Sequence, residues 1–118
     1  MKIKKDLLVA ILEAAKSAHP DEFVALLTGK KDVIEELVFL PFISGGTSAL
    51  IHLDMLPIGM RVIGTVHNHP SPSCEPSEED FALFTRFGSY HIIVCYPYTL
   101  KCWKCYDRRG EAVELEVI

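Results

Sequence analysis

The chain has 118 residues, of which 49% are hydrophobic and 24% are charged, a balance that suits one globular domain over residues 1–118. Its formal net charge of -4 and its scattered lysines and arginines argue against a nucleic-acid partner. The sequence contains neither a repeat nor a low-complexity run.

The first predicted element is a helix over residues 7–18. Its apolar residues recur at helical spacing and would pack on a sheet: Leu7, Leu8, Ile11, Ala14, Ala15 and Ala18. The run 7–12 follows several lysines, as in a signal peptide, but it is six residues long against the roughly seven to fifteen that such a segment needs. With no membrane-spanning segment either, we expect a cytoplasmic protein with no membrane partner.

The next part of the chain is rich in β-branched and apolar residues, which predicts strands. These predicted strands cover residues 23–28, 33–43, 49–53 and 61–66. Glycine-containing turns over 29–32 and 44–47 suggest antiparallel neighbours. A short turn or a single helical turn is expected over 54–60.

A second helix is predicted over residues 77–86. Ser77 and Asp80 have the spacing of a capping box, and apolar residues follow them at helical spacing. Gly88 is expected to end this helix.

A buried strand over 90–96 and a final hairpin of 103–107 and 112–117 complete the predicted elements. The segments 61–66, 77–86 and 90–96 have the order of a βαβ unit. The sequence therefore predicts an α/β domain in which a mixed sheet is flanked by two helices, in two or three layers.

Residues 67–80 carry a candidate metal site. On a strand, residues i and i+2 face the same side, so His67 and His69 can approach one ion while Asn68 faces away. A catalytic zinc takes three protein ligands and leaves its fourth position to water, and Asp80 supplies the third ligand after a proline-rich loop. A capping box alone, or His-x-His alone, is a weak signal, but joined at this spacing they favour one Zn²⁺ ion.

These residues resemble a known family. His67-x-His69, seven residues, Ser77, two residues and Asp80 resemble the JAMM motif of MPN-domain metalloproteases, which cleave ubiquitin and ubiquitin-like modifiers from their targets. Glu22, before a hydrophobic strand and a glycine, resembles the family's glutamate. The resemblance spans nearly the whole chain, looks especially close to small single-domain archaeal JAMM proteins, and implies an MPN/JAMM-like (cytidine deaminase-like) fold. Asn68 departs from the serine or threonine that the family more often has, which puts substrate contacts in more doubt than zinc binding.

The resemblance also implies a mechanism. Zinc would activate a water, Glu22 would take the proton of this water and pass it to the departing amine, and Ser77 would donate a hydrogen bond to the carbonyl oxygen. From the residues alone, Glu22 is an ordinary solvated loop residue. Glu75, Glu78 and Glu79 lie nearer to the motif in sequence, and we interpret them as solvated residues at the helix start.

The implied function is that of a zinc isopeptidase. Its partner would be a ubiquitin-like or β-grasp modifier protein, such as an archaeal small modifier or a sulfur carrier, together with its conjugates. Two alternatives stay open: a zinc amidase that acts on a smaller substrate, and a non-catalytic MPN scaffold that binds partner proteins. Such scaffolds usually lack some metal ligands, whereas this chain keeps all of them.

The four cysteines add one further hypothesis. Cys102 and Cys105 form Cys-x-x-Cys in a predicted strand, where half-buried structural thiols are favoured over a second zinc or a redox pair. In a βαβ unit, the loop after the first strand and the end of the second strand lie at one edge of the sheet. A disulfide between Cys74 and Cys95 is therefore an alternative to two free thiols, although intracellular disulfides are unusual outside some hyperthermophiles.

Overall fold

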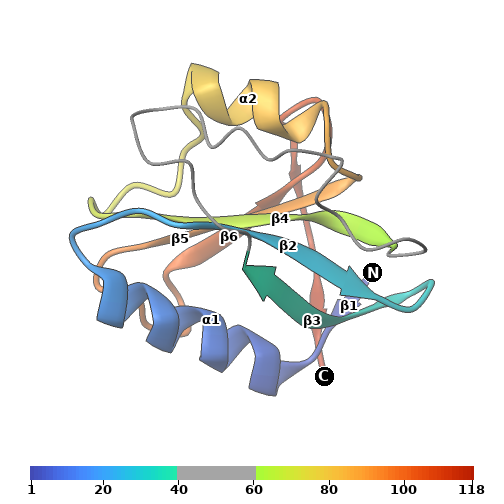
Figure 1. The fold of residues 1–118 in the computed structure, drawn as a ribbon, viewed down its shortest axis with the longest axis horizontal. Helices are drawn as coiled ribbons and strands as arrows, with labels where there is room; N and C mark the ends of the chain where they lie inside the picture. The colour runs from blue at the N-terminus through green and yellow to red at the C-terminus, as the bar shows by residue number, and fades with distance from the viewer. Residues whose placement is uncertain (40–60) are drawn as a thin grey trace.

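The computed structural model describes residues 1–39 and 61–118, which form an eight-stranded mixed sheet with a helix on each face (Figure 1). Helix α1 (Lys5–Ala18) covers one face, and α2 (Glu78–Phe84) covers the other. The expected α/β class, a mixed sheet flanked by two helices, is confirmed, and the layers are three. The end of the predicted strand 33–43, the strand 49–53 and the turns over 44–47 and 54–60 lie outside the described residues.

The strand order along the sheet is β7-β6-β5-β4-β2-β3-β1-β8. Strand β2 (Val24–Gly29) is antiparallel to both β3 (Val33–Phe39) and β4 (Val62–His69). Strand β5 (Tyr90–Cys95) is parallel to β4 and antiparallel to β6 (Trp103–Tyr106). The predicted antiparallel pair of β2 and β3 and the predicted βαβ unit are thus both confirmed.

Two predicted boundaries in this unit were wrong. Strand β4 does not end at residue 66 but continues through both histidines, because β5 pairs with it as far as His69 opposite Cys95. Helix α2 ends at Phe84 rather than near residue 86, since the Arg86 N–H bonds back to the Leu83 carbonyl in a tighter turn. Gly88, at φ 78°, then leads the chain into β5.

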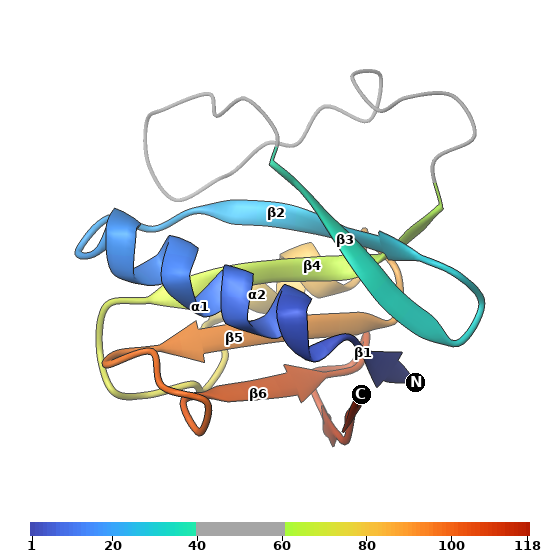
Figure 2. The ribbon, with the colours of Figure 1, turned by 90° about the horizontal axis from the view of Figure 1, so that it is seen from below.

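The predicted strand 112–117 is wrong as a single element. Strand β7 (Ala112–Val113) pairs with β6, while β8 (Glu116–Val117) pairs with β1 (Lys2–Ile3) at the opposite edge of the sheet. The short link between β7 and β8 reaches only about 10 Å, so the sheet must curl until its two edges approach each other (Figure 2). Strands of two residues, such as β1, carry no alternation that a sequence could reveal.

The main core lies between α1 and the sheet. The helix buries Leu8, Ile11, Leu12 and Ala15, as its spacing predicts. A smaller cluster under α2 joins Phe84, which is fully buried, to side chains of β5 and β6. This second cluster packs the end of α2 against the sheet. Among the described residues, neither helix is long and apolar enough to cross a membrane.

Candidate metal centre

The end of β4 presents both histidines to the side of the sheet that α2 covers. His67 lies opposite Val24 of β2, and the strand alternation puts His69 on the same side. Their Nε2 atoms are 3.1 Å apart. His67 is buried and His69 is half-buried. The predicted convergence of the two imidazoles is therefore present.

Asp80, in the first turn of α2, completes the group. Its Oδ1 lies 3.0 Å from Nε2 of His67, and its Oδ2 lies 3.2 Å from Nε2 of His69. One donor atom from each residue falls within 4.8 Å of the others. The structure thus brings together the three residues that the sequence nominated as metal ligands.

The hydrogen bonds of the rings define the chemistry of this group. A carbonyl can only accept, so Nδ1 of His69 donates to the carbonyl of Ser73 at 3.0 Å. In the neutral ring this leaves a lone pair on Nε2, which faces the other imidazole and the carboxylate. Within the described chain, the buried Nδ1 of His67 has no hydrogen-bond partner. Imidazole nitrogens and a carboxylate oxygen converging in this way fit the donor set of zinc.

The electrostatics of the group also favour a cation. The hydrogen bond to Asp80 raises the pKa of His69, against the effect of burial, and the charge of Glu22 adds a smaller contribution in the same direction. Although burial opposes it, hydrogen bonds from His67 and His69 hold the pKa of Asp80 well below its usual range. The carboxylate is therefore ionised, and the site attracts positive charge.

Ser77 and Asp80 form the predicted capping box at the start of α2. The Ser77 N–H donates to Oδ2 of Asp80 at 2.8 Å, and the Asp80 N–H donates to Oγ of Ser77 at 3.3 Å. One carboxylate thus both caps the helix and faces the histidines. Ser77 is exposed, so its hydroxyl lies at the surface beside the group.

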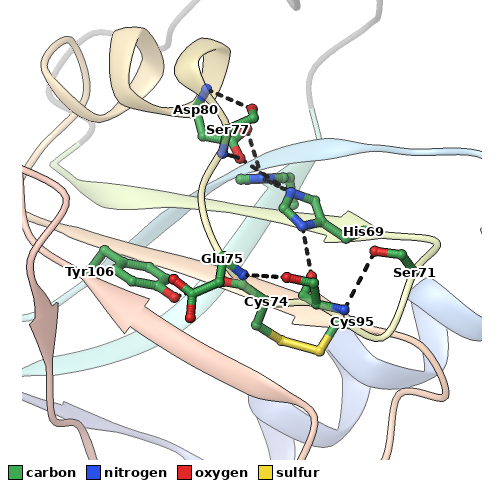
Figure 3. Close-up of polar contacts among 10 residues, drawn as sticks. His69, Ser71, Cys74, Glu75, Ser77, Asp80, Cys95 and Tyr106 are labelled. Atoms are coloured by element: carbon green, nitrogen blue, oxygen red, sulfur yellow. Dashed lines mark hydrogen bonds and ion pairs between the residues drawn. A yellow bond between two sulfur atoms is a disulfide. The ribbon is translucent and has the colours of Figure 1, made fainter.

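The loop between β4 and α2 is tied to β5 and β6. Cys74 is disulfide-bonded to Cys95, the partner of His69 in the sheet, with their Cα atoms 5.4 Å apart. The Tyr106 hydroxyl donates to the Cys74 carbonyl at 2.7 Å, and Lys104 pairs with Glu75 at 3.2 Å. Figure 3 shows His69 between Asp80 and this tethered loop. The attachments hold the Ser73 carbonyl where it orients the ring of His69.

Replacing both Cys74 and Cys95 with serine is expected to lower the free energy of unfolding by about 2–4 kcal/mol, because the bond closes a loop of 21 residues in the unfolded chain. Urea denaturation with and without reductant measures this change. A Cys102→Ser variant is the control and should keep the sensitivity to reductant. Free thiols at both positions after non-reducing digestion would contradict the prediction.

The other two cysteines are free thiols, Cys102 half-buried and Cys105 buried. Burial raises the pKa of Cys105 to about 12, so this thiol stays protonated and unreactive. Residues 1–39 and 61–118 contain no second group of potential metal ligands. The interpretation as a structural thiol agrees with the surroundings of Cys105, whereas the hydrogen bond with Thr99 lowers the pKa of Cys102.

Glu22 lies in the exposed segment between α1 and β2. Phe23 faces the main core, and Val24 lies opposite His67, so alternation places Glu22 on the histidine side of the sheet. The negative charge of Glu22 contributes to the raised pKa of His69. Glu75, Glu78 and Glu79 are exposed, as expected.

Two buried residues near the site have functions that sequence reasoning missed. Asn68 is fully buried and bonds to the backbone around Glu22, which the sequence did not indicate. The Tyr98 hydroxyl donates to the His69 carbonyl at 3.2 Å and lies 2.9 Å from Nδ1 of His19. The position of an amide side chain between two histidines on a buried strand could have indicated the role of Asn68. Nothing in the sequence indicated the role of Tyr98.

A mixed sheet that carries two histidines at the end of a central strand, facing an aspartate from the next helix, fits a metal-dependent hydrolase. Comparison with known proteins agrees. Residues 4–106 match the model of the prokaryotic homologues of the JAB domain. A probable metalloprotease of Haloferax volcanii is 31% identical over 127 residues, which cover 98% of this chain and 78% of that protein. The chain belongs to the family of prokaryotic homologues of the JAB domain.

Solved structures give the same relationship. A JAB1/MPN domain protein from Archaeoglobus fulgidus is 68% identical, with a TM-score of 0.84 and coverage of 100% of this chain and 99% of that one. A structure described as "JAMM: a metalloprotease-like zinc site in the proteasome and signalosome" is 63% identical, with a TM-score of 0.83 over 100% and 97% of the two chains. The resemblance to the JAMM and MPN proteins is confirmed, and with it the fold.

Proposed function

We propose that the protein is a zinc-dependent isopeptidase or peptidase that hydrolyses the amide bond at the carboxyl terminus of ubiquitin-like, β-grasp modifier proteins. The observation that carries the proposal is the convergence of His67, His69 and Asp80, each of which offers one ligand atom within 4.8 Å of the others. The probable metalloprotease among the relatives, and the neighbour described as having a metalloprotease-like zinc site, support the hydrolytic reaction.

Nε2 of His67, Nε2 of His69 and the Asp80 carboxylate would hold the ion. When bound, zinc supplies Lewis acidity, which makes a water nucleophilic near neutral pH and polarises the scissile carbonyl. The Ser73 carbonyl keeps the ring of His69 in the tautomer that offers Nε2. The capping box fixes the carboxylate, so these ligand groups are oriented before any ion binds.

Glu22 would be the general base. It lies on the histidine side of the sheet, it is exposed, and none of the three ligand groups is free to take a proton. Glu22 would accept the proton of the attacking water and then deliver it to the departing nitrogen, which in an isopeptide is a lysine Nζ. This transfer neutralises the leaving amine as the C–N bond breaks.

Ser77 would stabilise the negative charge that develops on the carbonyl oxygen. Its Oγ accepts the Asp80 N–H, which leaves the hydroxyl proton available to a substrate oxygen. A donor placed in this way typically lowers the barrier by a few kcal/mol. Capping and catalysis therefore use different parts of one hydroxyl group.

The proposed substrate is the extended tail of a modifier protein, and the proposed location is the cytoplasm. Ser77 and Glu22, which would flank the reacting bond, are both exposed. A tail can therefore reach the group while the folded part of the modifier stays outside.

The test is incubation with a panel of β-grasp modifiers fused to a reporter through either a peptide or a lysine isopeptide bond. We expect cleavage after the last residue of the modifier, loss of cleavage with a chelator, and recovery when zinc is added. Short peptide amides serve as the second substrate class. Cleavage of these alone would favour an amidase, and modifier binding by the zinc-loaded protein without cleavage would favour a scaffold.

A further inference from the structure

Asn68 lies next to the metal group but is not part of it. It lies between His67 and His69 in β4, but its side chain points to the opposite face of the sheet. Its exposed fraction is 0%. A fully buried primary amide is costly unless its donor and acceptor are satisfied, so the bonds that it makes indicate its purpose.

The amide of Asn68 bonds to the backbone on both sides of Glu22. Its Oδ1 accepts the N–H of Phe23 at 2.7 Å, and its Nδ2 donates to the carbonyl of Asp21 at 2.9 Å. A backbone N–H only donates and a carbonyl only accepts, so these two partners also fix the orientation of the amide. One side chain therefore holds the two peptide groups that flank the candidate base.

These two hydrogen bonds lie just beyond the end of the backbone pairing between β2 and β4. The pairing of β2 with β4 stops at Val24 opposite His67. Beyond this pair, Asn68 provides through its side chain the donor and the acceptor that strand backbones would otherwise exchange. The segment that carries Glu22 is thus held to β4 without being part of the ladder.

The orientation of Glu22 depends on this backbone. With the described residues, its carboxylate forms no hydrogen bond or ion pair. What directs the side chain is the alternation set by Phe23, which is 8% exposed and packs in the main core. Fixing the peptide groups before and after Glu22 therefore keeps its Cα–Cβ bond on the histidine side.

We propose that Asn68 is a positioning residue that fixes Glu22 over the metal group by bonding to the backbone on both sides of it. This inference rests on the proposed function, in which Glu22 is the base. Asn68 lies between His67 and His69 in β4. The same short piece of strand therefore carries two candidate ligands and holds the segment of the candidate base. A base misplaced by about 1 Å can cost on the order of a hundredfold in rate.

The test compares Asn68→Ala with wild type in zinc content, in cleavage of a ubiquitin-like fusion and in exchange of the Phe23 amide hydrogen. We expect unchanged zinc content, a kcat lower by about 10- to 100-fold, a KM within about threefold of wild type, and Phe23 exchange faster by at least about tenfold. In a Glu22→Gln background, measured by single turnover with excess enzyme, the same substitution should lower the rate by less than about threefold. This non-additivity identifies an effect that acts through Glu22.

Thr65→Val is the matched control. Thr65 is a buried polar residue of the same strand, and it bonds to His91 at 2.8 Å, away from the Glu22 segment. This variant should lose stability but keep its kcat. If Asn68→Ala does not fold, Asn68→Ser, which has one oxygen in place of the separate donor and acceptor, is measured in the same way, with smaller effects expected.

Three results would overturn the proposal: wild-type kcat in the Asn68 variant, unchanged exchange of the Phe23 amide, or an undiminished loss in the Glu22→Gln background. Full activity of the Glu22→Gln single variant is a different outcome. That outcome would remove Glu22 from the proposed mechanism, and the hydrogen bonds of Asn68 would then have no catalytic importance. The exchange rate of the Phe23 amide would still report whether Asn68 holds the segment.

Discussion

The Glu22→Gln variant is expected to bind zinc as wild type does and to lose on the order of 10²- to 10⁴-fold in kcat, the usual contribution of a general base. Glutamine keeps the size of the side chain but cannot take a proton. Glu22 does not belong to the metal group, and its segment is held by hydrogen bonds between its backbone and the Asn68 side chain, so the fold should not change. Metal analysis and the kinetics of cleavage of a ubiquitin-like fusion measure the two expected results.

The matched control is Glu79→Gln, which neutralises an exposed acidic residue at the start of α2. This variant should keep kcat within about twofold of wild type, since a surface charge near the site changes rates only weakly. Loss of activity in the control together with full activity in Glu22→Gln would exchange the roles of the two residues.

Asp80→Asn is expected to abolish metal-dependent stabilisation together with activity. Free zinc at about a thousandfold above its dissociation constant would raise the free energy of unfolding of the wild type by about 4 kcal/mol. The variant keeps an oxygen that can accept the Ser77 N–H, so the helix cap survives, but it removes the ionised ligand between the histidines. Thermal unfolding with added zinc and with chelator measures the difference.

In this experiment the metal-free proteins are compared first. Without zinc, the variant should unfold within a few degrees of wild type, because a capping residue contributes only about 1 kcal/mol. Equal stabilisation of both proteins by zinc would show that Asp80 is not a ligand. A Glu79→Gln protein should respond to zinc as the wild type does.

Most of the metal group could be predicted because its signals are local. The alternation of a strand puts His67 and His69 on one face, and the capping spacing puts Asp80 in the first turn of the next helix. Pairing between strands that are distant in sequence was harder to predict. The separation of β7 from β8 depends on the curl of the whole sheet, and the extension of β4 through His69 depends on its pairing with β5. Neither leaves a periodic pattern in the chain.

The sequence by itself determined the capping box of this protein and nominated the candidate ligand set, since both rest on spacings within 14 residues of the chain, from His67 to Asp80. Only the tertiary structure decided that the segment carrying Glu22 lies beside the histidines. The register of β2 against β4 brings Glu22 there from 45 positions away in sequence. The same register gives Asn68 its partners, because a buried amide is satisfied by whichever backbone the fold places beside it.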